Sequence, residues 1–271
     1  MSSDIEFADL DGLPLTDVRM AIRNGRYGGH TAGLAPGQLQ CNLAILPESH
    51  ARDFLEYCKR NPKPCPIAGV SKPGVPHITR LGETIDLRTD TPLYNVYRNG
   101  VLDRQIPDLN GLWQDDFVAF AIGCSFTFEN ALLRAGIPMR HISENVTVPM
   151  YRSSIETHPF ARFGGGMVVS MRPVRRNDLD RVREICARYP LAHGAPVHVG
   201  DPAAIGISAL DAPDWGKSVL VKEDEEPVFW ACGVTPQVAI MNAKPALCIT
   251  HAPGAMLIAD IDEFSAPIFD E

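Results

Sequence analysis

The sequence predicts an α/β fold, in which a mixed sheet is flanked by helices and joined by a second, smaller α+β lobe. Two observations carry this prediction. Short apolar runs typical of strands alternate with segments of helical spacing, and the character of the chain changes at Leu112. Strand-like runs dominate again after residue 204. We therefore expect a discontinuous main domain, residues 1–111 and 205–271, and an inserted lobe over residues 112–204.

The first 111 residues predict two helices, one buried strand and one hairpin. Gly25 and Asn61-Pro62 provide the stops for the two helices. Asn99-Gly100 is the strongest short hairpin signal, because both residues tolerate the positive φ of a tight turn. In the buried strand, Gln40 and Asn42 share one face by the two-residue period, so their amides need a backbone or ligand partner. The predicted elements are helices over 15–24 and 50–60, a strand over 40–46, and hairpin strands over 94–98 and 101–106.

The rest of the chain predicts a mainly helical stretch followed by several short strands. Two helical segments are joined through Gly123-Cys124-Ser125, and Asn177 caps a third helix. That third helix carries Asp178 and Asp180 early and Arg188 late, an order that the helix dipole favours. The predicted elements are helices over 115–122, 126–135 and 177–189, a strand over 166–172, and short strands over 196–199, 219–221, 228–232, 246–250 and 256–260.

One strand end carries the clearest functional signal. The apolar run 228–232 stops at Gly233, and Thr235 can cap a helix whose first residue is Pro236. Such a junction exposes unpaired N–H groups at the positive end of a helix dipole, and the two together attract anions. We expect it to form one small-molecule site with two further polar turns, at residues 123–129 and 250–254.

Composition and charge exclude several classes of partner. The formal net charge is −8 and basic residues do not cluster, which argues against nucleic acid and against an anionic membrane surface. No apolar run approaches the ~18 residues of a membrane span, and the N-terminus lacks the features of a signal peptide. The seven cysteines are scattered without a C-x-x-C pair, which suits a reducing compartment. We expect a cytoplasmic protein.

Cofactor and metal motifs are incomplete in this sequence. Gly216-Lys217-Ser218 would end a phosphate-binding P-loop, but Asp211 stands where that motif has glycine. Gly164-Gly165-Gly166 precedes a strand instead of following one, so the dinucleotide fingerprint fails as well. His193 and His198 flank a glycine and a proline, so this segment cannot present a zinc-binding pair on a helix. We predict no cofactor and no metal.

Several single residues have both a structural and a catalytic interpretation. Cys232 is either a core cysteine or a thiol whose pKa the adjacent helix start lowers. Glu129 falls in the first turn of its helix, where it complements the dipole or acts as a base. Arg140 and His141 follow a helix stop in a loop, where they face solvent or a ligand. His251 ends an apolar strand and needs a specific partner, and we predict it as the acid or base.

Seven segments, taken together and in order, resemble the hydro-lyase family that includes D-glutamate cyclase. They extend over nearly the whole chain and are more specific for the family than for its substrate. The segments are residues 35–47, 123–129, 136–141, 169–173, 193–198, 229–237 and 250–254.

The resemblance implies a two-lobed α/β fold and the elimination of water from a small amino acid, with D-glutamate closing to 5-oxo-D-proline. It brings no assignment of catalytic residues, so the roles are inferred from the three turns. We expect His251, Cys232 and Glu129 to be catalytic, with His251 moving the proton. The substrate would be a small-molecule carboxylate, bound by Gln40, Asn42, Cys124, Ser125, Arg140, His141, Arg172, His198, Thr235, Gln237 and Thr250.

Two alternatives stay open at this level. The enzyme could dehydrate another small carboxylic acid, or the chain could be a non-catalytic binder of 5-oxoproline or an amino acid. A homo-oligomer is also left open, because one sequence does not determine the oligomeric state.

Overall fold

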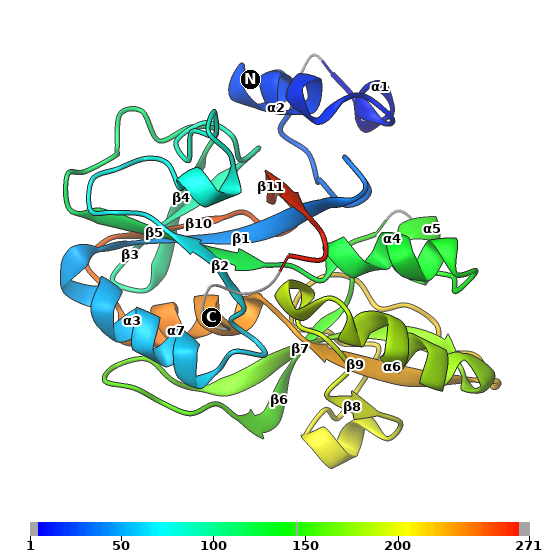
Figure 1. Ribbon diagram of the computed structural model, residues 1–271. Helices are drawn as coiled ribbons and strands as arrows, with labels where there is room; N and C mark the ends of the chain where they lie inside the picture. Colours follow the sequence, from blue (N-terminus) through cyan, green and yellow to red (C-terminus); the bar gives the residue numbers. More distant parts are fainter. Residues whose placement is uncertain (1–4, 145, 266–271) are drawn as a thin grey trace.

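The computed structural model describes residues 5–144 and 146–265. Within these residues the strands form two sheets, a larger one of seven strands and a smaller one of four. Helices lie against both sheets (Figure 1), so the predicted α/β fold with flanking helices is confirmed. The strand pairs of both described sheets are antiparallel.

The larger sheet is organised around β1, which has neighbours on both sides. The strand order is β2-β5-β1-β10-β3-β4, and β11 also pairs with β1. Leu43 and Ile45 of β1 enter one core cluster and Ala44 and Leu46 another, because side chains alternate between the two faces of a strand. The strands are β1 (Gln38–Pro47), β2 (Ile67–Val70), β3 (Tyr94–Arg98), β4 (Val101–Ile106), β5 (Phe117–Gly123), β10 (Cys248–His251) and β11 (Leu257–Asp262).

The smaller sheet has the order β6-β7-β9-β8. Its centre is the pair β7 and β9, whose register places Ser170 opposite Trp230 and Arg172 opposite Val228. These side chains face helices, so Arg172 is fully buried although it is charged. The strands are β6 (Met150–Glu156), β7 (Gly166–Arg175), β8 (His198–Val199) and β9 (Glu225–Ala231).

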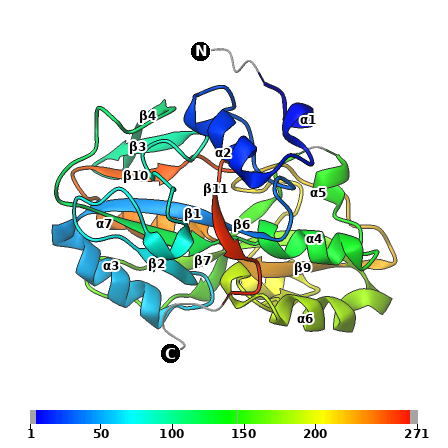
Figure 2. The same ribbon diagram turned by 45° about the horizontal axis from the view of Figure 1, so that its top comes forward.

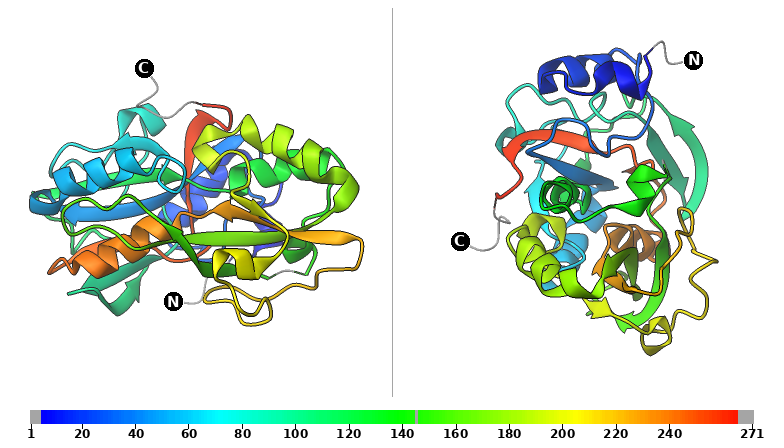
Figure 3. Two further views of the ribbon diagram at one scale, coloured as in Figure 1. Left: turned by 90° about the horizontal axis from the view of Figure 1, so that it is seen from below. Right: turned by 90° about the vertical axis from the view of Figure 1, so that its right-hand side faces the viewer.

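One helix, α7, lies between the two sheets (Figure 1; Figure 3). Ala239 and Ile240 pack in the cluster on the larger sheet, whereas Val234 and Val238 pack with Val168 of the smaller sheet. This explains why α7 is apolar around most of its circumference. The helices are α1 (Phe7–Leu10), α2 (Leu15–Arg23), α3 (Glu48–Arg60), α4 (Phe126–Arg134), α5 (Arg140–Ser143), α6 (Leu179–Ala187) and α7 (Val234–Ala243), with short 3₁₀ turns at Thr79–Leu81, Arg176–Asp178, Pro190–Ala192 and Pro202–Ile205.

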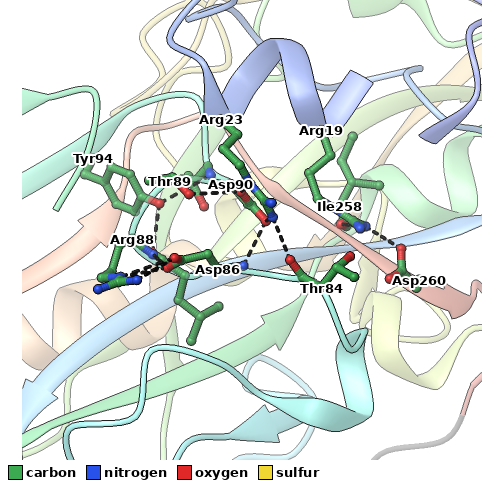
Figure 4. A network of polar contacts seen from close by, with 12 residues as sticks. Arg19, Arg23, Thr84, Asp86, Arg88, Thr89, Asp90, Tyr94, Ile258 and Asp260 are labelled. Atoms are coloured by element: carbon green, nitrogen blue, oxygen red, sulfur yellow. Dashed lines mark hydrogen bonds and ion pairs between the residues drawn. The ribbon is translucent and has the colours of Figure 1, made fainter. Parts of the chain in front are cut away.

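Two arginines attach α2 to the body of the molecule (Figure 4). Arg23 donates to both carboxylate oxygens of Asp90, at 2.7 and 2.6 Å. Arg19 donates to the carbonyl of Ile258 at 3.0 Å and forms an ion pair with Asp260. Figure 2 shows α2 beside β11, the strand that contains Ile258. The N-terminal helices are therefore held by charge as well as by apolar packing.

The structure corrects three sequence-based assignments. Residues 115–122 were predicted as a helix, but they contain the first residues of β5, every residue of which is buried. A continuous apolar run of this length fits either element, and pairing with both β1 and β2 decides for the strand. The predicted strand at 219–221 lies in a loop, where Leu220 is 68% exposed. Asn177 belongs to a 3₁₀ turn, and α6 begins two residues later.

The two sheets draw strands from both predicted domains. β5 belongs to the larger sheet although it lies within residues 112–204, and β9 belongs to the smaller sheet although it lies outside them. The division into a discontinuous domain and an inserted lobe stays a prediction. None of the helices in the described residues has the length and hydropathy that crossing a bilayer requires.

Candidate active site

Two strand-to-helix turns meet in the interior of the molecule. The first leads from β5 through Cys124 into α4, and the second leads from β9 through Cys232 into α7. Cys124 and Cys232 belong to one buried cluster, together with Phe126 and Val234 at the two helix starts. From there α4 and α7 extend to opposite sides of the molecule (Figure 1). The two turns that the sequence singled out are therefore brought together.

Asn42 of β1 joins these two turns. Its side-chain amide donates to the carbonyls of Ile122 at 3.2 Å and of Gly123 at 3.0 Å. The same amide packs against Gly233, where an added Cβ would lie 2.2 Å from Nδ2. Gly233 has an ordinary φ of −64°, so glycine is required here by space and not by backbone conformation. Of the two kinds of partner expected for the Asn42 amide, backbone or ligand, the structure shows the backbone.

The first turns of α4 and α7 present uncapped amides. Ser125 and Gly233 are the residues that precede the two helices, and neither makes a side-chain capping bond. Thr235, which was predicted as a cap, lies inside α7 instead. Its hydroxyl accepts from the amide of Val168 at 3.0 Å and so ties α7 to β7. The amides of Thr127 and Thr235 already donate to the carbonyls of Cys124 and Cys232, at 3.1 and 3.0 Å, and Pro236 has no N–H. The capacity of each helix start to bind an anion therefore rests on its first amide, that of Phe126 in α4 and that of Val234 in α7.

The thiols at the two turns are buried and neutral. Burial raises the pKa of Cys124 to about 12, and it also raises the pKa of Cys232. The amides of Gly233 and Val234 act in the opposite direction on Cys232, but they do not outweigh desolvation. The prediction that the helix start lowers this pKa is therefore wrong. The Cys232 thiol contacts the Met150 sulfur at 3.5 Å.

His251 lies at the end of β10, close to Gln237 of α7. Its Nδ1 accepts from the amide of Leu43 at 3.1 Å, the shorter of its two contacts with Leu43, which favours the tautomer with the proton on Nε2. The Gln237 amide nitrogen is 3.4 Å from each ring nitrogen. Burial lowers the pKa of His251 to about 4, so the ring is neutral near pH 7. Thr250 takes no part in this contact, because its hydroxyl donates to the carbonyl of His251 at 2.9 Å.

Glu129 of α4 is the centre of a buried charged cluster. Arg172 donates to its Oε1 through Nε at 2.9 Å, and His141 Nε2 lies 3.1 Å from the same oxygen. Burial acts to raise the pKa of Glu129, but the charges of His141 and Arg172 lower it to about 2. Arg172 also donates to Ser170 and Ser125, each at 3.0 Å. Glu129 is thus ionised at neutral pH, and every nitrogen of Arg172 has a protein partner.

The side chains of three other predicted site residues bind partners outside the two turns. Gln40 uses its amide to hold the loop before β1, donating to the carbonyl of Thr31 at 2.9 Å and accepting from the Thr31 hydroxyl at 2.8 Å. Arg140 is the first residue of α5 instead of part of a loop, and its two nitrogens bind Glu225 at 2.7 and 2.6 Å. Glu225 is the first residue of β9, whereas Cys232 follows the other end of that strand, so this ion pair lies away from the β9 turn. His198 donates to the carbonyl of Asp201 at 2.7 Å and is half-exposed.

A sequence profile of the D-glutamate cyclase family matches residues 118–260, which is more than half of the chain. The chain belongs to the D-glutamate cyclase family. The match contains both turns, the charged cluster and His251. Of the seven segments that resemble the family, only residues 35–47 fall outside it.

Two relatives extend the similarity of this D-glutamate cyclase family member over almost the whole chain. A protein of Jannaschia sp. (strain CCS1) described as "Putative hydro-lyase" is 56% identical over 253 residues, covering 93% of this chain and 95% of its own. A protein of Dinoroseobacter shibae with the same description is 60% identical, covering 95% and 86%. These similarities identify the chain as an enzyme of the hydro-lyase class. A nitrogen repressor-like protein of Methanococcus jannaschii has a TM-score of only 0.38 at 12% identity, which supports no conclusion.

The sequence-based prediction missed two residues of this D-glutamate cyclase family site. Ser170 completes the charged cluster by accepting from Arg172, and it stands two residues before Arg172 on the same face of β7. The strand period could have indicated it. Thr127 accepts from the amide of Gln40 at 3.2 Å and so connects α4 to β1. Nothing in the sequence indicates that contact, because it depends on how the sheet and helix are placed.

Proposed function

We propose that this enzyme binds a small dicarboxylic amino acid between the starts of α4 and α7 and cyclises D-glutamate to 5-oxo-D-proline with loss of water. The observation that carries the proposal is the meeting of two uncapped helix starts at one buried position. Each start can take one carboxylate, and D-glutamate has two. Membership of the D-glutamate cyclase family supports the same choice of substrate.

The reaction needs little beyond orientation and proton transfer. The amine nitrogen attacks the side-chain carboxyl carbon, a C–N bond forms and a C–O bond breaks. The ammonium gives up two protons, and both leave with the departing oxygen as water. Holding amine and carboxyl together supplies much of the rate enhancement, because the step is intramolecular. Helix amides can stabilise the oxyanion of the tetrahedral intermediate.

In this proposal His251 relays the proton. It takes a proton from the ammonium before it donates one to the departing oxygen, so the ring is neutral again at the end of the step. A ring that is neutral at the start suits this role better than a cation, and the Gln237 amide lies against the ring. The neutral thiols of Cys124 and Cys232 would shape the site instead of attacking the substrate, since a thiol is a weak nucleophile. We further propose that the enzyme acts in the cytoplasm, consistent with its seven free cysteines.

The test follows 5-oxoproline formation from D-glutamate and L-glutamate by proton NMR. We expect turnover of D-glutamate, and we expect His251→Asn to lower kcat by about 100-fold or more, the usual contribution of a positioned acid or base. His77→Asn is the matched control, because His77 is exposed on a loop. Unchanged kcat in folded His251→Asn would remove His251 from the mechanism.

Two other outcomes would replace the proposed function. Thermal stabilisation by D-glutamate without turnover would indicate a binder of amino acids. Turnover of a different small carboxylic acid, with D-glutamate inert, would indicate a dehydratase. A panel of such acids in the same NMR assay separates these outcomes.

A further inference from the structure

A surface hollow of about 440 Å³ lies at the far end of α4 from the candidate active site. Its charged lining consists of Arg134 of α4 together with Arg181, Glu184 and Arg188 on or next to α6. The two helices lie side by side (Figure 1; Figure 2), joined by an apolar cluster that includes Leu132 and Val182. None of the site residues discussed above lines this hollow.

Two of the three arginines have no acidic partner in the part of the chain that the structure describes. Arg181 and Arg188 are seven residues apart, two helical turns, and so share one face of α6. Both are exposed, and within the described residues neither has a carboxylate oxygen within 4.0 Å. By contrast, Arg183 on the same helix pairs with Asp180 at 3.2 Å. In residues 5–144 and 146–265, the guanidinium groups of Arg181 and Arg188 thus have no carboxylate that competes with an anion in the hollow.

The wall of the hollow formed by Arg134, Tyr189 and Phe264 is fixed in position. Arg134 donates to Glu263 Oε1 at 2.9 Å, and the Tyr189 hydroxyl lies 3.3 Å from the same oxygen. The rings of Tyr189 and Phe264 are in contact, tilted by 32° with their centroids 4.7 Å apart, and both line the hollow. Glu263 is buried behind this wall, so it orients Arg134 while leaving that side chain 57% exposed. One arginine and two rings are therefore preorganised.

We propose that the hollow binds a small polyanion bearing phosphate or carboxylate groups. Three guanidinium groups and one carboxylate line it, a local excess of positive charge in a chain of net charge −8. Planar guanidinium groups match phosphate and carboxylate oxygens in pairs, so an anion that spans the two helices relieves their mutual repulsion. The two aromatic rings offer apolar surface for the carbon skeleton of such a ligand.

This site is separate from the one in the proposed function. Arg134 is the last residue of α4, whose first residue lies beside Cys124. Nine residues of helix rise about 13 Å, so a ligand in the hollow does not reach the buried turns. Its binding is measured directly and requires no turnover of D-glutamate.

The test is isothermal titration calorimetry with inorganic pyrophosphate and, separately, with citrate. We expect saturable binding of one ion per protein molecule. Tighter binding of pyrophosphate would identify phosphate as the preferred group, and tighter binding of citrate would identify carboxylate. Arg181→Gln combined with Arg188→Gln should weaken Kd by about tenfold or more, since it removes two charge-assisted contacts. Arg183→Gln is the matched control and should change Kd by less than about twofold, because it removes the same type of charge outside the hollow.

Two results would overturn the inference. Absence of saturable binding of both ions to the wild-type protein at low ionic strength would exclude the site. Equal loss of affinity in Arg183→Gln and in the double variant would show attraction to overall charge, with no defined hollow involved. Circular dichroism of each variant confirms that the helices are intact, so a loss of binding is not a loss of fold.

Discussion

At the scale of single residues, two buried titratable side chains have opposite charge states because only one of them has charged neighbours. Glu129 is surrounded by His141 and Arg172, whose charges lower its pKa to about 2. His251 contacts Leu43 and Gln237, which carry no charge, and burial lowers its pKa to about 4. One group is therefore kept charged and the other neutral at pH 7. The ionised Glu129 is placed to stabilise the fold, whereas the neutral His251 ring suits proton transfer.

Replacing Glu129 by glutamine tests its contribution to the stability of the fold. Glu129→Gln keeps the shape but leaves the buried guanidinium of Arg172 without its carboxylate partner, so we expect a loss of unfolding free energy of about 3–5 kcal/mol. Urea unfolding followed by circular dichroism measures it. Glu223→Gln, on an exposed loop, should change stability by no more than about 0.5 kcal/mol. Equal stability of the two variants would contradict the account of the cluster.

At the scale of elements, the joint between β1 and the start of α7 depends on one glycine. Gly233→Ala would place a methyl group 2.2 Å from the Asn42 amide, so either α7 or Asn42 must move. We expect a loss of about 1–3 kcal/mol in unfolding free energy and a fall in kcat on D-glutamate. Gly111→Ala is the control, because its added Cβ meets nothing within 4 Å. Wild-type stability and activity in Gly233→Ala would show that the two turns tolerate separation.

The attachment of α2 is a second test at this scale. Arg23→Met leaves the buried carboxylate of Asp90 without its guanidinium partner (Figure 4), and we expect a loss of about 1–3 kcal/mol. Hydrogen exchange should rise first in residues 15–23 and 84–90, which this pair connects. Arg26→Met, an exposed change, should leave exchange unaltered. Hydrogen exchange that rises uniformly over the chain would contradict a local attachment of α2 by the Arg23–Asp90 pair.

At the scale of the whole molecule, stability should fall with acidification in two stages. The pKa values of buried His193 and His251 are lowered to about 4 from 6.5, so the unfolded chain binds protons first and stability falls between pH 6.5 and 4. Glu129 has its pKa lowered from 4.5 to about 2, so its contribution is present above pH 4.5 and is lost as pH falls towards 2. Urea midpoints across this range measure both stages.

Variants assign the two stages. His193→Asn with His251→Asn should flatten the first stage and leave the second, while Glu129→Gln should do the reverse. A single transition in the wild type, centred on the ordinary range of exposed carboxylates near pH 4, would contradict both assignments.

Local patterns predicted much of the fold and part of the site. The helices near residues 15–23 and 48–60, the hairpin at Asn99-Gly100, and the turn at Gly233 follow from spacing, glycine and proline alone. β5 was mistaken for a helix because a short apolar run fits either element, and only its neighbours in the sheet decide between them. Arg140 was mistaken for a loop residue because its partner Glu225 is 85 positions away in the sequence.

The sequence by itself determined the class of fold, the family, and the residues at each strand-to-helix turn, because these depend on local propensity and on motifs. Tertiary structure alone decided that the β5 and β9 turns meet through Asn42, that the Cys232 thiol has a raised pKa, and that Arg172 is held by Glu129. The physical reason is that burial and charge pairing are set by groups far apart in the chain. Their energies exceed the local effect of a helix start, and they exist only after the sheets and helices have packed.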